Sequence, residues 1–562
     1  MAVIEDKSSP GTLQLIDAGG ELHVKHSGAE HDIVLIPLPS ANAIEDDPED
    51  PLNWSLRRKL LQTSCVVMYT VMMVFPSSAV YSVTTPISKA THLKVSDLVS
   101  GTGAMFLFYG WGCIVWQALA LQYGKRPAYL VSMAGSVIIM ACAPLCTTNG
   151  PYLANKILQG FFGAPVESLC EISMTDISQT LADLVKWFAH ERPLYLAIYG
   201  LSLAFSGKFA PVFSAFINTG QGWRWTLWWC AIGIAVAFVY CFFLMEETNY
   251  DRHTHQSTTS ADTSTEVVNE PVIINGEKSS PEKESDSETN AAFDRTAAET
   301  GQVVYPRKSY WQKLSVVDKT RQNRILDIMW APFKFFTFPV VVWAGFMYGT
   351  NGLVWPGILN ATASPLYTGT YHFNSNEVGY AYFGAVVGMI IGSLWVTFAG
   401  PQLVMRLARR NKGVAEPEHI LWLFGASVVC VPFAMLLWGL GAEYKIHWFG
   451  LVFAQCILAI SSTLCLSTAI QYATSSYLDL GGEHITTIIL IRNTLSFAIN
   501  YGITPWINAQ GRRDTFITVA VLALVCNSTM FLMIYYGKRL RQHSATRYWK
   551  WVEEARAKGF SH

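Results

Sequence analysis

Long apolar blocks, each of a length that can cross a lipid bilayer, recur along the whole chain. About 20 apolar residues at a rise of about 1.5 Å per residue cover the roughly 30 Å hydrocarbon layer of a bilayer. Blocks of this kind lie on both sides of one polar stretch, so the sequence predicts an all-α integral membrane protein with about twelve transmembrane helices in two six-helix halves. The predicted spans are residues 60–84, 100–123, 128–147, 152–174, 194–218, 223–245, 333–357, 378–400, 420–442, 447–472, 484–508 and 515–536.

Composition supports this interpretation. Of the 562 residues, 51% are hydrophobic and 14% are charged, which is typical of a membrane protein and unlike a soluble enzyme. The polar stretch is rich in Ser, Thr, Asp and Glu, and it has too little apolar surface to offset the entropy of ordering it, so we expect disorder there. The predicted division is a tail at 1–59, a six-helix half at 60–245, a linker at 246–332, a second six-helix half at 333–537 and a tail at 538–562.

The distribution of Lys and Arg predicts the orientation, because short loops rich in these residues stay in the cytoplasm. The opposite side carries scattered cations but no comparable clusters, so both termini are predicted to be cytoplasmic. The polar segment before Trp54 has no secretory signal pattern. Asn360, in an Asn-Ala-Thr sequon predicted to lie between spans 7 and 8, would then face outside as a glycosylation candidate. The clusters are Arg57, Arg58 and Lys59; Lys125 and Arg126; Arg192; Arg307, Lys308 and Lys313; Arg406, Arg409, Arg410 and Lys412; and Lys538, Arg539 and Arg541.

The sequence lacks three short patterns that are typical of metal sites, phosphate-binding loops and serine hydrolases. Its 11 Cys residues have no CxxC or Cys/His ligand spacing. A phosphate-binding Gly loop followed by Lys and Ser/Thr is missing, and so is a Gly-x-Ser-x-Gly element. We therefore expect no cofactor, no metal, no enzymatic activity and no nucleic-acid partner.

Short motifs are spread over nearly all of the chain outside the linker. They are DPEDPLNWSLRRK, QYGKRPAYL, KILQGFFGAPVESL, HERP, GWRWTLWW, EETNYDR, LARRNKGVAEPE and IRNTLSFAINYGITPWI. Each half also places a cationic loop between its second and third spans. In this ordered set the chain resembles the major facilitator superfamily, and within it the fungal twelve-span branch that contains drug:proton antiporters and organic-cation or polyamine carriers. The resemblance implies alternating access, in which two halves rock around a binding site near the midplane.

Two stretches depart from the family pattern. Leu121 stands where the loop between spans 2 and 3 usually has an acid, although Gly124, Lys125 and Arg126 are kept as candidates for a gating loop. A charge latch between the halves at this loop is therefore not supported. In span 5 the antiporter element, with its paired glycines, reads APVFSA at 210–215. This weakens the antiport assignment but keeps small residues for close helix packing.

Ionisable residues inside the spans are the main functional candidates, because a charge at mid-membrane costs at least ~2.5–3.5 kcal/mol unless it faces a cavity or a partner. Span 4 has Lys156, where the family often has Arg, and two acids, Glu167 and Glu171, which share one helix face. We interpret Glu167 as the first candidate for proton coupling, followed by Glu171 and by Asp176 at the inner end of the span. The alternative is structural: Glu171 lies at the interface, and Glu167 pairs with a cation of a neighbouring span.

Three further intramembrane residues are candidates for the substrate cavity, together with Lys156. Arg492 and Asn493 lie near half depth in span 11, where Arg492 could hold a carboxylate such as Glu167 ionised or repel cationic substrates. The alternative is that Arg492 has a purely structural role and holds the two halves together. Lys208 in span 5 could line the external mouth, or its side chain could reach the interface as a bystander, which we favour slightly.

Aromatic residues in the cavity-type spans form the other candidate set. Tyr69 and Tyr81 lie in span 1, and Tyr348 and Trp355 lie in span 7. The faces of Tyr and Trp attract organic cations by ~0.5–2 kcal/mol each. The alternative is that these residues belong to the core or to the interfacial belts.

The resemblance implies a monomeric, proton-coupled carrier in the fungal plasma membrane, whose partners are a small organic molecule, the proton and the lipid bilayer. Export of drug-like compounds or secondary metabolites is favoured over uptake of a cation such as a polyamine. Protonation of Glu167 would bias the exchange between inward-open and outward-open states. A non-transporting nutrient sensor that signals through the linker is a different class of hypothesis.

Overall fold

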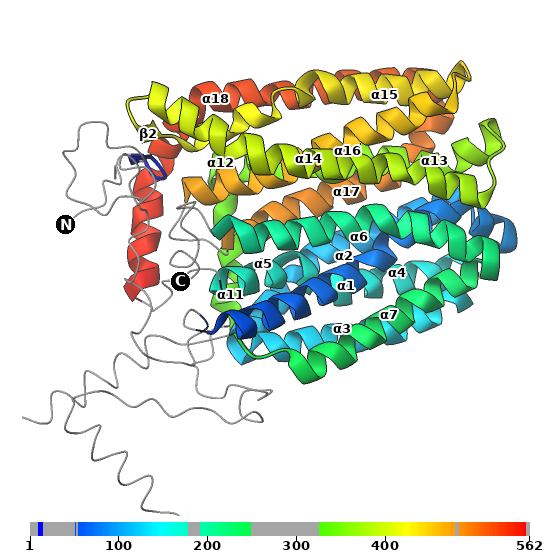
Figure 1. Cartoon of the computed structure of the whole chain (residues 1–562), viewed down its shortest axis with the longest axis horizontal. Helices are drawn as coiled ribbons and strands as arrows, with labels where there is room; N and C mark the ends of the chain where they lie inside the picture. Colours follow the sequence, from blue (N-terminus) through cyan, green and yellow to red (C-terminus); the bar gives the residue numbers. More distant parts are fainter. Residues whose placement is uncertain are drawn as a thin grey trace, which may run out of the picture.

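The chain folds as a bundle of long helices that lie side by side (Figure 1). A computed structural model describes residues 9–14, 51, 54–177, 192–248, 325–477 and 483–557. Nearly all of them are helical, which confirms the predicted all-α fold. The segment 9–14 and the end of the last helix lie at the same end of the bundle, which we call the terminal face; the opposite end is the far face.

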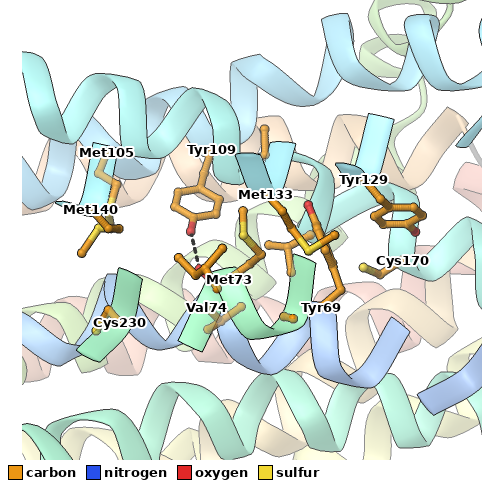
Figure 2. Packing of buried hydrophobic residues seen from close by; sticks show 14 of the residues in the cluster. Tyr69, Met73, Val74, Met105, Tyr109, Tyr129, Met133, Met140, Cys170 and Cys230 are labelled. Carbon is orange, nitrogen blue, oxygen red and sulfur yellow. Dashed lines mark hydrogen bonds between the residues drawn. The ribbon is translucent and has the colours of Figure 1, made fainter. Parts of the chain in front are cut away.

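The described residues of the first half form seven helices. A break at Ala164, with Pro165 at the start of the next helix, divides the fourth crossing into two pieces. Figure 2 shows how the interior packs: Tyr69, Met73, Tyr109 and Met133 interdigitate, and the Tyr109 hydroxyl donates to the Met73 carbonyl at 3.2 Å. The helices are α1 (Leu56–Ala90), α2 (Val95–Tyr123), α3 (Lys125–Cys142), α4 (Asn149–Gly163), α5 (Pro165–Ile177), α6 (Arg192–Gln221) and α7 (Trp223–Leu244).

The second half repeats this plan with two additions at the terminal face. The short helix α11 is bent by 92° from the span that follows it. Two short strands, β1 (Leu13–Gln14) and β2 (Val414–Ala415), pair antiparallel, with Leu13 opposite Ala415. The helices are α11 (Ile325–Lys334), α12 (Pro339–Gly349), α13 (Trp355–Thr370), α14 (Ser375–Arg410), α15 (Ser427–Glu443), α16 (Trp448–Ser476), α17 (Glu483–Gln510) and α18 (Arg512–Ala557); a π-helical turn (Thr350–Val354) joins α12 to α13, and a 3-10 helix, η6 (Pro417–Phe424), precedes α15.

The predicted number of spans can be traced helix by helix. In the described part of the chain, 9 helices are long and apolar enough to cross a membrane, and there are up to 10 candidates when the bent pair around α11 counts as one. The two remaining crossings are α4 with α5, which are 15 and 13 residues long, and α17, which is 28 residues long. Pro165 explains the first case, and polar residues such as Arg492 and Asn493 interrupt the second.

Some boundaries differ from the sequence prediction. Span 7 was predicted to end at 357, but α13 stays helical to Thr370, because Pro365 does not end the helix. The predicted tail at 538–562 is helical as far as Ala557, and Figure 1 shows this red end of α18 lying across the terminal face. The predicted linker at 246–332 lies outside the described residues from 249 to 324.

The two halves meet along α2 with α17, α6 with α14, and α1 with α13. Small residues allow the helix axes to come close. A Cβ atom added at Gly110 would lie 2.7 Å from the Cβ atom of Asn493, and one added at Gly379 would lie 2.7 Å from that of Ala215. The predicted role of small residues in span 5 is therefore seen at Ala215.

Replacing Gly110 by Val is expected to separate α2 from α17, because a side chain at this position overlaps Asn493. Overpacking of this kind costs about 1–3 kcal/mol, so the thermal unfolding midpoint of the purified protein should fall. Gly200→Val is the matched control, since a Cβ atom at Gly200 meets nothing within 4 Å. Equal unfolding midpoints for the two variants would contradict the close approach at Gly110.

Candidate functional site

A buried ion pair joins the two halves in the interior of the bundle. Arg492 on α17 pairs through Nη2 with the carboxylate of Glu167 on α5. Its Nη1 donates to the hydroxyl of Tyr348 on α12 at 2.6 Å, and its guanidinium carbon lies 4.7 Å from the centroid of that ring. Only 3% of Arg492 and 8% of Glu167 is exposed. We call these three residues the central cluster.

Local structure explains how the central cluster is held. Pro165 begins α5 and puts Glu167 in its first turn, where the helix dipole favours a negative charge. Asn493 follows Arg492, packs beneath Gly110 and accepts a hydrogen bond from Arg492 Nη2 at 3.3 Å. Since an Arg side chain keeps its charge, the Glu167 carboxylate compensates a cation that would otherwise be very costly at this depth.

Glu171 lies one turn beyond Glu167, on the side of the terminal face. It is 4% exposed, and it has neither a hydrogen bond nor an ion pair with any residue that the structure describes. The two acids predicted to share a helix face are therefore in different situations, one paired and one unpaired. Asp176, the third candidate, lies in α5, but its side chain is outside the described residues.

The other cation of span 4 is held inside the first half. Lys156 Nζ donates to Gln159 Oε1 at 2.9 Å and lies 5.8 Å from the centroid of the Tyr152 ring. Lys156 is buried, and both of these contacts are with residues of its own helix. The structure does not bring Lys156 into contact with the central cluster.

The candidate gating loop is attached to the end of α7. Gly124 has a φ of 120° and turns the chain from α2 into α3. The backbone N–H groups of Lys125 and Arg126 donate to the Glu247 carboxylate at 3.0 and 2.9 Å, and Arg126 Nη2 donates to the Phe242 carbonyl at 2.7 Å. These contacts all join residues of the first half. This agrees with the presence of Leu121 in place of an acid, which gave no support for a charge latch between the halves. Glu247 itself was missed, although it stands in the EETNYDR motif.

The four aromatic candidates lie in different places. Tyr348 belongs to the central cluster, whereas Tyr69 is fully buried in the first half and hydrogen-bonds Ser132 at 2.8 Å. Tyr81 and Trp355 pack in one apolar cluster that contains residues of both halves. Among them, only Tyr348 contacts the charged residues of the central cluster in the part of the chain that the structure describes.

Lys208 faces a small cavity between the halves. Asn360 lines the same cavity, so it lies inside α13 and not in the external loop predicted from the sequence, because α13 continues past the sequon. The lining residues come from α6, α13, α14 and α16: Gly207, Lys208, Pro211, Pro356, Leu359, Asn360, Tyr382, Ala385, Gln455, Leu458 and Ala459.

The family is decided by comparison with known proteins. The model of the Major Facilitator Superfamily matches residues 66–505 of the chain. The chain belongs to this superfamily. It is therefore a membrane transporter and not an enzyme, and the resemblance seen in the sequence is confirmed.

Relatives that match over nearly the whole chain are fungal. One is the "Uncharacterized MFS-type transporter C1271.10c" of Schizosaccharomyces pombe, 24% identical over 97% of this chain and 94% of the relative. "Protein HOL1" of Saccharomyces cerevisiae is 22% identical over 91% and 90%, and "MFS transporter cpaT" of Aspergillus oryzae is 23% identical over 89% and 90%. A solved structure of a POT family transporter has a TM-score of 0.51 at 12% identity and covers 86% of this chain and 96% of its own, which supports the fold.

The transporter has a second buried charge cluster, at the terminal face, that the sequence did not predict. Arg541 on α18 is 0% exposed and donates to Glu416 at 2.6 Å and to Glu418 at 2.9 and 2.7 Å. It also donates to the Pro10 carbonyl and, at 3.1 Å, to the Thr12 hydroxyl. These contacts fix the segment 9–14 against the second half. We call Arg541, Glu416 and Glu418 the terminal cluster.

Glu416 stands just before η6, and its carboxylate accepts hydrogen bonds from three residues. Burial acts to raise its pKa, but hydrogen bonds from Lys538, Arg541 and Thr12 outweigh this and hold the pKa below its ordinary value. The EPE element of the LARRNKGVAEPE motif supplied the only sequence signal for this cluster, since it contains both acids.

Proposed function

We propose that this transporter is a monomeric, proton-coupled carrier of a small organic molecule, with Glu171 as the residue that takes up and releases the proton. The observation that carries the proposal is the unequal pairing of two acids on one helix face. Glu167 is engaged by Arg492, whereas Glu171, one turn away, has no partner within the described residues. An isolated charge at this depth is costly, so a proton on Glu171 removes that cost.

The coupling follows from two acids that share one cation across the halves. With Glu171 protonated, Arg492 stays on Glu167 and keeps α5 and α17 together. With Glu171 ionised, the two carboxylates compete for Arg492, and the pairing that holds the halves weakens. Release of the proton would thus favour the rocking motion that alternating access requires. The sequence favoured Glu167 as the proton carrier; its ion pair makes Glu171 the better candidate.

We further propose that the terminal face is cytoplasmic, that the membrane is the fungal plasma membrane, and that drug-like compounds or secondary metabolites are exported. The cationic clusters at the start of α1, at the start of α3, at the end of α14 and within the end of α18 all lie at the terminal face, which supports this orientation. The direction and the class of cargo rest on the resemblance to fungal drug:proton antiporters.

Glu171→Gln is expected to abolish flux driven by a pH gradient while it preserves exchange in the absence of a gradient, because Gln imitates the protonated acid. The measurement is flux of a panel of drug-like compounds in proteoliposomes with and without the gradient. A loss of at least about tenfold in driven flux is expected, since general proton-transfer groups contribute at least that much.

Glu443→Gln, at the exposed end of α15, is the control and should behave as the unchanged protein does. If flux through the unchanged protein does not depend on the pH gradient, the proposal of proton coupling is wrong. An unchanged pH dependence in a well-expressed Glu171→Gln variant would remove Glu171 from the mechanism.

A further inference from the structure

Lys208 lies too deep in α6 for its ammonium group to reach the membrane interface easily. At about 1.5 Å per residue, it stands about 20 Å from the last residue of α6, Gln221, and about 24 Å from the first, Arg192. Lys208 therefore lies close to the middle of α6 and of the candidate span Ile198–Gln221, and the middle of a span is about 15 Å from either edge of the hydrocarbon layer. The bystander interpretation of Lys208 therefore fails on depth, and its side chain lines the cavity between the halves.

Buried polar groups without partners line the same cavity. Gln455 on α16 is 2% exposed, and neither its Oε1 nor its Nε2 has a hydrogen-bond partner within the described residues. The hydroxyl of Tyr382 on α14, 3% exposed, also lacks one in this part of the chain. An unpaired buried amide and hydroxyl are costly, and both groups can offer hydrogen bonds to a molecule in the cavity.

The charge of the cavity indicates the kind of group that it receives. Its described lining contains Lys208 but no Asp or Glu, and Lys208 has no ion-pair partner among the residues that the structure describes. A cationic group would therefore meet repulsion here. Leu359, Leu458 and Pro211 form an apolar wall, which suits the body of an organic molecule.

We propose that this cavity binds the carboxylate of the transported molecule, an organic acid with an apolar body. The Lys208 ammonium supplies the counter-charge, and Gln455 and Tyr382 donate hydrogen bonds to the carboxylate oxygens. One compact ammonium matches a single negative charge, whereas doubly charged phosphates are held by several cations or by the planar fork of Arg. This inference rests on the proposed function, since it names the substrate class of that transporter.

Three probes with the same body and different head groups test the proposal: 3-phenylpropionate, 3-phenylpropionamide and 3-phenylpropylamine. The purified full-length protein is titrated with each probe, and the thermal unfolding midpoint gives the apparent affinity. We expect the acid to stabilise the protein more than the amide or the amine does. Lys208→Met should weaken the acid at least about tenfold, as loss of a charged hydrogen bond predicts.

Lys208→Glu separates a binding role of Lys208 from a merely structural one, because only a binding role predicts a change in which head group is preferred. It is expected to reverse the preference, so that the amine binds better than the acid. Lys89→Met, at the exposed far-face end of α1, is the control and should leave acid binding unchanged. These substitutions remove no hydrogen bond or ion pair of Lys208 with another described residue, so folding should survive.

Three results would overturn the proposal: no stabilisation by the acid, equal or better stabilisation by the amine in the unchanged protein, or full acid affinity in Lys208→Met. Binding is measured without a pH gradient, so its failure would leave proton coupling by Glu171 standing. Conversely, acid binding together with flux that ignores the gradient would overturn the coupling proposal alone.

Discussion

Replacing Arg492 by Gln is expected to destabilise the transporter by about 3–5 kcal/mol, because Glu167 is left buried without its cation. Glu167→Gln alone should be similarly harmful, since Arg492 cannot give up its charge. The double variant removes both charges and should recover most of the lost stability. It should still transport poorly, because the shared cation is gone. Thermal unfolding of the four proteins gives the coupling energy between the two residues.

Arg513→Gln, at the exposed second residue of α18 on the far face, is the matched control and is expected to change the unfolding midpoint little. A double variant as unstable as Arg492→Gln would show that the pair is not the source of the loss. A double variant with full pH-driven flux would exclude the central cluster from proton coupling.

Arg541→Met is expected to have an effect of similar size, because it leaves Glu418, which is buried, and Glu416, whose side chain is 10% exposed, without their main cation. The segment 9–14 should come away from the second half, since Pro10 and Thr12 lose their shared donor. Hydrogen exchange at residues 9–14 measures this release. Arg539→Met is the control, since Arg539 is exposed two residues earlier on the same helix. Unchanged protection of residues 9–14 in Arg541→Met would contradict the role of the terminal cluster.

The terminal cluster should lose stability as the pH falls. The pKa of Glu416 is lowered in the folded protein, so its stabilising contribution is complete above the ordinary value of 4.5 and is lost as the pH falls toward the lowered pKa. Docking of residues 9–14 should therefore be intact at neutral pH and weaken below about pH 4.5.

The apolar blocks were sufficient to predict the fold, because a helix that crosses lipid must be long and apolar wherever it faces lipid. Helix ends were predicted less well. Asn360 was predicted to lie in a loop, but α13 continues past it and through Pro365. Proline is tolerated inside membrane helices, since neighbouring groups can satisfy the freed carbonyl.

The candidate site was predicted in part. Charges at membrane depth must find partners, so Glu167 and Arg492 could be paired from the sequence alone. Tyr348 was named for its aromatic face, but its hydrogen bond to Arg492 depends on how α12 packs against α17. Gln455 was not predicted, because it is neither charged nor aromatic, although an amide deep in an apolar span is a usable signal.

The terminal cluster could not be derived from sequence, because its members approach one another only in the folded chain. Thr12 and Glu416 are 404 positions apart, and Thr12 and Arg541 are 529 positions apart. Local patterns carry no information on which distant segments meet.

The docking of residues 9–14 has a consequence for biosynthesis. Arg541 lies 529 positions after Thr12, on the end of α18 that extends beyond the last predicted span. At a synthesis rate of about 5–20 residues per second, residues 9–14 wait on the order of 30–100 s for this partner. They leave the ribosome long before they can dock, and their docking marks a chain that has been translated through α18.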